Sequence, residues 1–143
     1  MVSRCCDSPS LTPLMNLSER GVPHGGPGHS IGHDYTRVSR CGACAGGVVV
    51  HHSHDCWDPA DHPSWDMYWW WRIDPADMGA MLEAAASCPA PLDSSCACRV
   101  HEGLGGSHVP PRQARSTETP YEKAPVPRAA VRVEDGTPRW TEG

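Results

Sequence analysis

The sequence predicts a small α+β domain, in which an antiparallel three-stranded sheet packs against one helix, with a zinc-ribbon-like Cys-x-x-Cys turn and disordered segments on both sides. Three observations predict this fold. The runs GVVVHHSH and MYWWWRI are rich in β-branched and aromatic residues, which is typical of strands. A segment with apolar residues at helical spacing follows them. Six of the eight cysteines also lie in this region, between residues 31 and 106.

Composition divides the chain of 143 residues into three parts. Residues 1–30 are predicted to be a flexible segment rich in Gly, Pro and His, and residues 107–143, with six of the fifteen prolines, a disordered tail. Residues 31–106 are predicted to fold, but only ten of these 76 residues are Leu, Ile, Val or Phe. Because so few apolar side chains make a thin core, we expect a metal to stabilise the domain.

Charge and hydropathy exclude some classes of partner. The formal net charge is −5, and residues 31–106 carry ten acidic residues against four arginines, which disfavours binding to nucleic acid or to an anionic membrane. The first fifteen residues lack the apolar run of a secretory signal, and no stretch approaches the ~18 apolar residues of a membrane helix. We therefore expect a cytoplasmic location, where cysteines more often bind metals than form disulfides.

The expected elements follow one another between residues 35 and 89. Residues 35–40 alternate enough to be a third strand, joined to the GVVVHHSH strand by the turn CGAC. The helix is expected to begin after Asp74, a plausible N-cap followed by proline, and to end before Pro89. Its apolar stripe comprises Met78, Met81, Leu82 and Ala85. Cys88 extends this stripe, so a role as a small core residue is open to it.

A structural zinc site is the main chemical prediction. Cys41 and Cys44, two residues apart in a tight turn, can direct both thiolates at one ion. The second pair of ligands is expected to be Cys98 and His101, with Cys96 able to replace either one. Which of these residues and Cys88 complete the site stays open, because the two pairs lie 54 residues apart, from 44 to 98.

A cluster of histidines supports an alternative function. Cys41-x-x-Cys44 followed by His51-His52 resembles, over about a dozen residues, small His–Asn–His endonucleases, which often place a Cys-x-x-Cys turn before a strand ending in paired histidines. The resemblance implies that His52 is a general base beside a divalent ion. The alternative is therefore a metal-dependent hydrolase, above all a nuclease, that uses His51, His52 and His54. The chain departs from that family because its only asparagine, Asn16, lies upstream of the motif.

A run of aromatic residues predicts a surface for a protein partner. In a strand, Trp69 and Trp71 would face the helix, leaving Tyr68, Trp70 and Arg72 on the opposite face. Trp, Tyr and Arg are enriched at the centres of interfaces. Four acidic residues flank this strip: Asp55, Asp58, Asp61 and Asp66. The leading interpretation is thus a zinc-stabilised binding module, of the adaptor, inhibitor or antidote type, for a protein that could be basic, rather than an enzyme.

Overall fold

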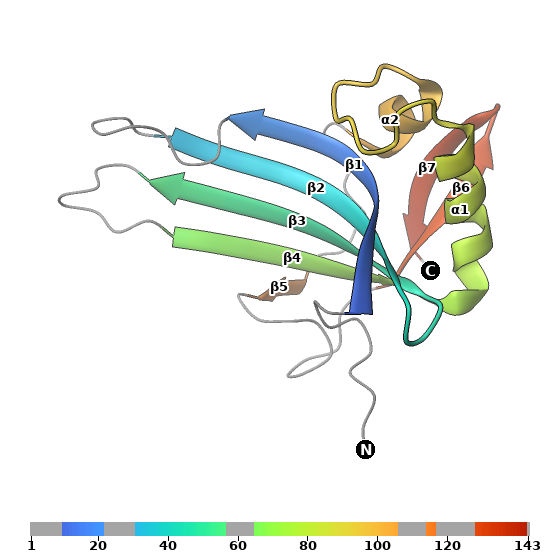
Figure 1. Cartoon of the computed structure of the whole chain (residues 1–143), viewed down its shortest axis with the longest axis horizontal. Coiled ribbons are helices and arrows are strands. Elements are labelled where there is room, and N and C mark those ends of the chain that lie inside the picture. The colour runs from blue at the N-terminus through green and yellow to red at the C-terminus, as the bar shows by residue number, and fades with distance from the viewer. Residues whose placement is uncertain (1–9, 22–30, 57–64, 106–113, 117–127, 143) are drawn as a thin grey trace.

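The computed structural model describes residues 10–21, 31–56, 65–105, 114–116 and 128–142 (Figure 1). An antiparallel sheet has the strand order β1-β2-β3-β4-β5. Its members are β1 (Leu11–Gly21), β2 (Ile31–Cys41), β3 (Gly47–Cys56), β4 (Trp65–Ile73) and the short β5 (Ala114–Ser116). Between β4 and β5 come a 3₁₀ turn, η2 (Pro75–Asp77), and the helices α1 (Met78–Ser87) and α2 (Arg99–Leu104). A separate hairpin consists of β6 (Ala129–Glu134) and β7 (Thr137–Glu142).

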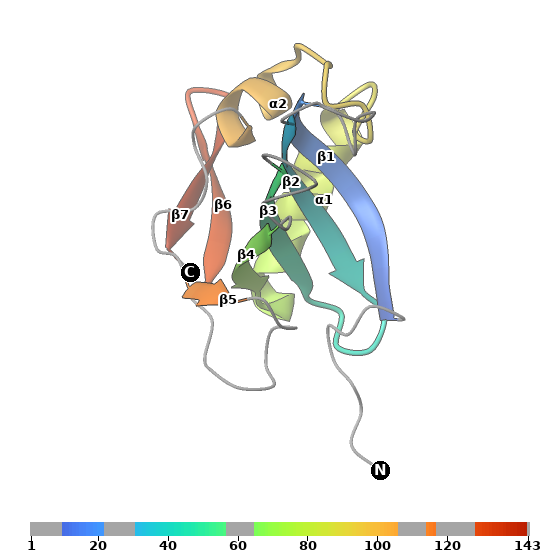
Figure 2. The same cartoon turned by 90° about the vertical axis from the view of Figure 1, so that its left-hand side faces the viewer.

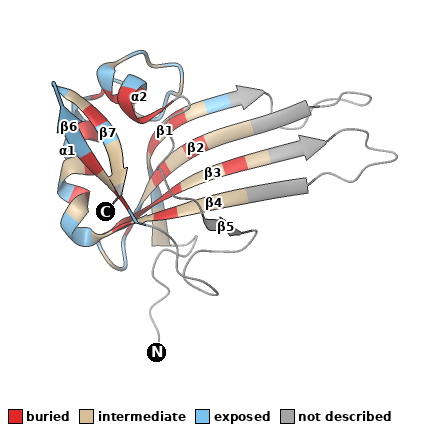
Figure 3. Cartoon of the chain, turned by 180° about the vertical axis from the view of Figure 1, so that it is seen from behind, coloured by how far each residue is buried: buried red, intermediate tan, exposed pale blue. Residues whose placement is uncertain are grey.

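The helices and the hairpin gather at one end of the long strands (Figure 1). Figure 2 shows β1 at one edge of the sheet and the hairpin beyond the other edge, next to β4. Buried residues concentrate at the same end as the helices (Figure 3). The core there includes Trp71 and Ile73 of β4, Met15 of β1, Met81 of α1 and Leu104 of α2, all at most 1% exposed. Tryptophan and methionine thus fill volume that the sparse Leu, Ile and Val residues leave.

The predicted α+β class with an antiparallel sheet is confirmed, but the prediction of three strands is wrong. Four long strands form the sheet, and β5 adds a short fifth at the edge of β4. The additional long strand is β1, which lies in the segment expected to be a loop. Its pairing with β2 shifts register between Pro13 and Met15 and again between Asn16 and Ser18. These irregularities interrupt the simple alternation by which a strand is found in a sequence.

The β6–β7 hairpin lies in the segment expected to be a disordered tail. Glu134 pairs with Thr137, so the connecting turn has two residues, Asp135 and Gly136. Their φ angles of 51° and 77° are both left-handed, as a type I′ turn requires. Ala129 and Val131 from β6 enter the core and attach the hairpin to the rest of the fold. In this range the structure differs from the sequence-based prediction.

The predicted helix is confirmed in position, with a 3₁₀ turn before it. Met78, Met81 and Ala85 are buried, and the stripe continues to Cys88, which is also buried. Asp74 holds the N-cap position of η2, but its carboxylate makes no cap hydrogen bond. It pairs instead with Arg72 at 2.7 Å and with Arg128 at 3.2 Å. Within the described part of the chain, no helix has the length and apolar character to cross a membrane.

Gly103 tests the contact between α2 and β7. A Cβ at this position would overlap the backbone carbonyl of Pro138 and approach Thr137 Cγ2 to 2.8 Å. We expect Gly103→Ala to reduce the free energy of unfolding by about 1–3 kcal/mol or more, because β7 must move away from α2. In the control Gly79→Ala, the new Cβ meets nothing within 4 Å, and stability should rise by up to about 1 kcal/mol. Denaturant unfolding of both variants measures the difference; equal stabilities would contradict this packing.

Candidate functional site

The loop between α1 and α2 brings four potential metal ligands together: Cys88, Cys96, Cys98 and His101. Cys88 is the C-cap residue of α1, and Cys98 is the N-cap residue of α2. Between them the chain reverses through two turns, in which the Asp93 N–H donates to Ala90 O at 3.1 Å and the Cys96 N–H donates to Asp93 O at 3.1 Å. The loop therefore folds back on itself and returns Cys96 and Cys98 to the end of α1.

Asp93 stabilises the second turn of this loop. One of its carboxylate oxygens accepts hydrogen bonds from the Ser95 backbone N–H at 2.9 Å and from the Ser95 hydroxyl at 2.6 Å. These hydrogen bonds hold the pKa of Asp93 below its ordinary value. The arrangement is an Asx turn, a local structure that Asp-x-Ser sequences favour.

The donor atoms of the cluster lie close to one another. Cys88 Sγ lies 3.8 Å from Cys96 Sγ and 3.4 Å from Cys98 Sγ. His101 Nδ1 lies 3.3 Å from Cys88 Sγ and 3.4 Å from Cys98 Sγ, and all four donors lie within 4.8 Å of one another. With zinc–ligand bonds of about 2.3 Å to sulfur and about 2.0 Å to nitrogen, a tetrahedron has edges of about 3.8 Å and about 3.5 Å. The four residues lie close enough to bind a metal ion.

His101 is oriented by a residue far away in the sequence. Its Nε2 lies 2.9 Å from the backbone carbonyl oxygen of Asn16 in β1. Because a carbonyl can only accept a hydrogen bond, Nε2 carries the proton, and the lone pair of Nδ1 is directed at the thiols. Such a partner behind a histidine fixes both the tautomer and the ring orientation that metal ligation needs.

The cysteines of the cluster differ in acidity. Burial raises the pKa of the Cys88 thiol to about 12. Burial also opposes ionisation of Cys98, but hydrogen bonds from the His101 backbone N–H and from the Cys88 and Cys96 thiols outweigh it and lower the pKa of Cys98 to about 6. Cys98 is therefore more ready than Cys88 to bind as a thiolate. The Cys88 thiol needs the field of a cation to lose its proton.

The structure brings together three of the residues predicted to bind a metal, Cys96, Cys98 and His101. Cys41 ends β2 and Cys44 lies in the turn between β2 and β3, which in Figures 1 and 2 lies below α2, and neither residue belongs to the cluster. Cys88 takes their place in the cluster. The spacing Cys-x₇-Cys-x-Cys-x₂-His, four donors within fourteen residues from 88 to 101, is the signal that identifies it.

The predicted catalytic histidines do not form a comparable site among the described residues. His51 lies on the sheet face that packs against α1. Its Nδ1 shares a hydrogen bond of 2.8 Å with the Thr36 hydroxyl. His52 lies on the opposite face, between the rings of Tyr35 at 4.8 Å and Tyr68 at 4.4 Å. The side chain of His54 lies outside the described residues. The two described histidines thus point to opposite sides of β3.

Three of the side chains predicted to form a partner surface share one face of the sheet. Tyr68, Trp70 and Arg72 occupy the sheet face away from α1, and each is half-buried. The rings of Tyr68 and Trp70 stack with their centroids 5.8 Å apart. This extends the stack of Tyr35, His52 and Tyr68 into an aromatic ladder of four rings across β2, β3 and β4. The side chains of Asp55, Asp58, Asp61 and Asp66 lie outside the described residues.

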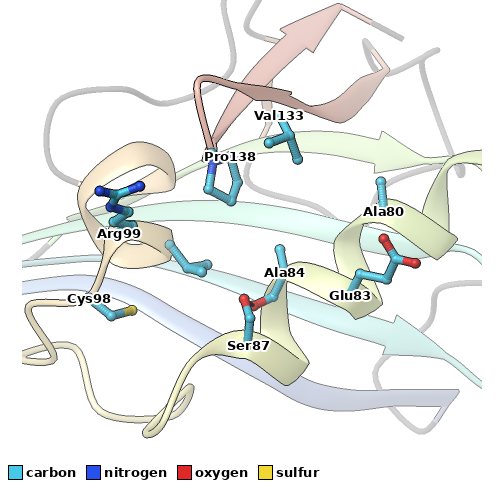
Figure 4. Close-up of a pocket in the computed structure, with 10 residues that line it drawn as sticks. Ala80, Glu83, Ala84, Ser87, Cys98, Arg99, Val133 and Pro138 are labelled. Carbon is cyan, nitrogen blue, oxygen red and sulfur yellow. Dashed lines mark hydrogen bonds between the residues drawn. The ribbon is translucent and has the colours of Figure 1, made fainter.

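A cavity of about 520 Å³ lies beside the cluster, between α1, the start of α2 and the β6–β7 hairpin (Figure 4). Its lining is largely apolar, with Ala84, Val133 and Pro138 among its residues. Arg99 and Glu83 supply charges of opposite sign from α2 and α1. Cys98 belongs both to the cavity wall and to the metal-ligating cluster.

No protein-family model, curated protein or solved structure matches this chain.

Replacing Cys88 tests whether this residue is a metal ligand or only a core residue. A buried core cysteine tolerates alanine at modest cost, whereas a ligand does not. We expect Cys88→Ala to release divalent metal to a chromophoric chelator at least tenfold more readily than the wild type, with Ser87→Ala, one residue earlier, behaving as the wild type. Equal metal retention in both variants would assign Cys88 to the core alone.

Proposed function

We propose that the chain is a zinc-stabilised protein-binding module. The observation that carries the proposal is the convergence of four donors within 4.8 Å of one another, from Cys88, Cys96, Cys98 and His101. Three thiols and one imidazole are a ligand set that suits Zn²⁺, and four protein donors leave no position for a substrate or an activated water. The role of the ion is therefore structural, and cysteines kept as thiols for it fit the reducing cytoplasm.

Zinc would supply folding energy where the core cannot. Binding free energies of structural zinc sites are of order 10 kcal/mol at neutral pH, as large as the net stability of many domains. The site joins the end of α1 to the start of α2 and, through His101, to β1. An ion at this point would join the three elements that contribute Met15, Met81 and Leu104 to the core.

The binding surface we propose is the aromatic ladder on the opposite face of the sheet. Tyr68 and Trp70 provide rigid, amphipathic area of the kind enriched at interfaces. The strand pairing places Asp55 opposite Trp65 and Asp66 opposite His54, at the end of the β3–β4 hairpin beyond Tyr68. Acidic residues beside an aromatic strip favour a basic protein as the partner, as for an inhibitor, an antidote or an adaptor.

Removing two of the thiols tests the structural role of zinc. We expect the variant Cys96→Ser/Cys98→Ser to contain one zinc fewer per chain than the wild type and to lose cooperative unfolding, because the site contributes to folding directly. Elemental analysis and thermal unfolding measure both effects, and a chelator should lower the Tm of the wild type. Cys56→Ser is the control. Unchanged zinc content and Tm in the double variant would contradict the proposal.

Neutralising the acidic residues tests the partner. We expect Asp55, Asp58, Asp61 and Asp66, all changed to Asn, to abolish retention of basic proteins on the immobilised chain, as should Trp70→Ala. The matched control changes four exposed acids elsewhere, Glu83, Glu102, Glu134 and Asp135, to their amides. Because the net charge changes equally, only the position differs. Quantitative mass spectrometry of retained proteins decides; equal loss in the control would reduce the effect to net charge.

A further inference from the structure

The core-facing side of β6 continues beyond the core. Ala129 and Val131 are buried, but Val133, which follows them in the same alternation, is 62% exposed. Val133 lines the cavity between α1 and the β6–β7 hairpin. A branched apolar side chain therefore stands on a wall of this cavity, where a bound molecule would cover it.

The side chains of α1 that line the cavity are small. Ala80, Ala84 and Ser87 recur there at helical spacing. Val133 and the buried Pro138 line it from the hairpin. Short side chains on the helix leave the space open. Its volume of about 520 Å³ lies within the range of about 300–1,000 Å³ that is typical of small-molecule sites.

Two charged side chains of opposite sign lie at the ends of the cavity. Figure 4 shows Arg99 of α2 at one end and Glu83 of α1 at the other. Val133, Pro138 and Ala84 lie between them in this view. In the described part of the chain, neither charged group forms an ion pair or a side-chain hydrogen bond. Both charges are thus available to a bound molecule.

The guanidinium of Arg99 lies against the turn of the hairpin. At Gly136, where φ is 77°, an added Cβ would lie 3.1 Å from Arg99 Nη1. Glycine at this position therefore suits both the left-handed turn and the close approach of the guanidinium. The planar group has a fixed fork of N–H donors, which matches the two oxygens of a carboxylate.

We propose that the cavity binds a short free peptide with apolar side chains. Arg99 donates hydrogen bonds to the C-terminal carboxylate of the peptide, and Glu83 accepts them from the N-terminal ammonium. The apolar side chains of the peptide cover Val133 and Pro138. A zwitterion pairs both charges of the cavity at once, whereas a fatty acid would leave Glu83 without a partner. This inference goes beyond the function proposed above and does not depend on the zinc ion.

Calorimetric titration of the full chain with trileucine tests both ends of the site. The wild type should bind trileucine about tenfold more tightly than its C-terminal amide or its N-acetyl form, because each modification removes one charged hydrogen-bonding partner. Arg99→Gln should lose the preference for the free carboxylate and keep that for the free ammonium, and Glu83→Gln should do the reverse. The controls Arg132→Gln and Glu102→Gln change exposed charges outside the cavity wall and should bind as the wild type.

The other outcomes overturn the inference. A folded, zinc-containing wild type that does not bind trileucine at millimolar concentration would overturn it and leave the zinc site intact. Octanoate bound as tightly as trileucine, with no effect of Glu83→Gln, would assign the cavity to a carboxylate amphiphile. Equal losses in the two controls would reduce the effect to net charge. Should a variant fail to fold, the three forms of trileucine still decide, because they are compared on the wild type.

Discussion

Two hydrogen bonds of the Asn16 backbone join β1 of the sheet to α2 and to the loop between α1 and α2. The Asn16 N–H donates to Pro91 O at 2.8 Å, and the Asn16 carbonyl accepts from His101 Nε2 at 2.9 Å. Since β1 is an edge strand, these groups would otherwise be open to another chain. The same imidazole directs Nδ1 at the thiols, so the position of β1 and the geometry of the cluster depend on each other. The helix that carries His101 is attached to the hairpin in turn, because Trp140 Nε1–H donates to Leu104 O at 2.9 Å.

Local patterns predict the part of the fold whose periodicity is regular. The β3 and β4 strands, the turn of Cys41 and Cys44 and the helix after Asp74 all lie where the sequence predicts them. The β1 strand is not predicted, because its two register shifts interrupt the alternation of a regular strand. Its buried Met15 and Leu17 find their partners only through tertiary packing. The β6–β7 hairpin is different, since Asp135-Gly136 is a strong hairpin signal and proline content alone obscured it. Composition is an average over a segment, whereas a turn depends on two residues.

The candidate site is predictable in its members more than in its arrangement. Cys96, Cys98 and His101 follow from spacing, but pairing them with Cys41 and Cys44 requires the chain to close a loop of more than fifty residues. Cys88 closes a loop of eight residues to Cys96, at a smaller entropic cost. The place of Cys88 at the end of an apolar helical stripe suggests a core role. In the structure Cys88 is buried, with 6% of its surface exposed, and its Sγ also lies 3.3 Å from His101 Nδ1. Amphipathic periodicity therefore does not separate a ligand from a core residue.

Without a metal, little would hold the four residues of the cluster together. Thiols are poor hydrogen-bond donors and acceptors, so three of them against one imidazole contribute little stability by themselves. The six-residue α2 is too short to be stable alone, and the loop before it buries few large apolar groups. Burial raises the pKa of Cys88 to about 12, so bringing its sulfur to the cluster as a thiolate is unfavourable without a compensating charge. The divalent cation that we propose would offset these costs, because it would favour the thiolates and join the end of α1 to the start of α2. It would also give His101, held by Asn16, an ion to ligate. The cost of assembling the cluster and the thinness of the core thus both favour the zinc ion that we propose.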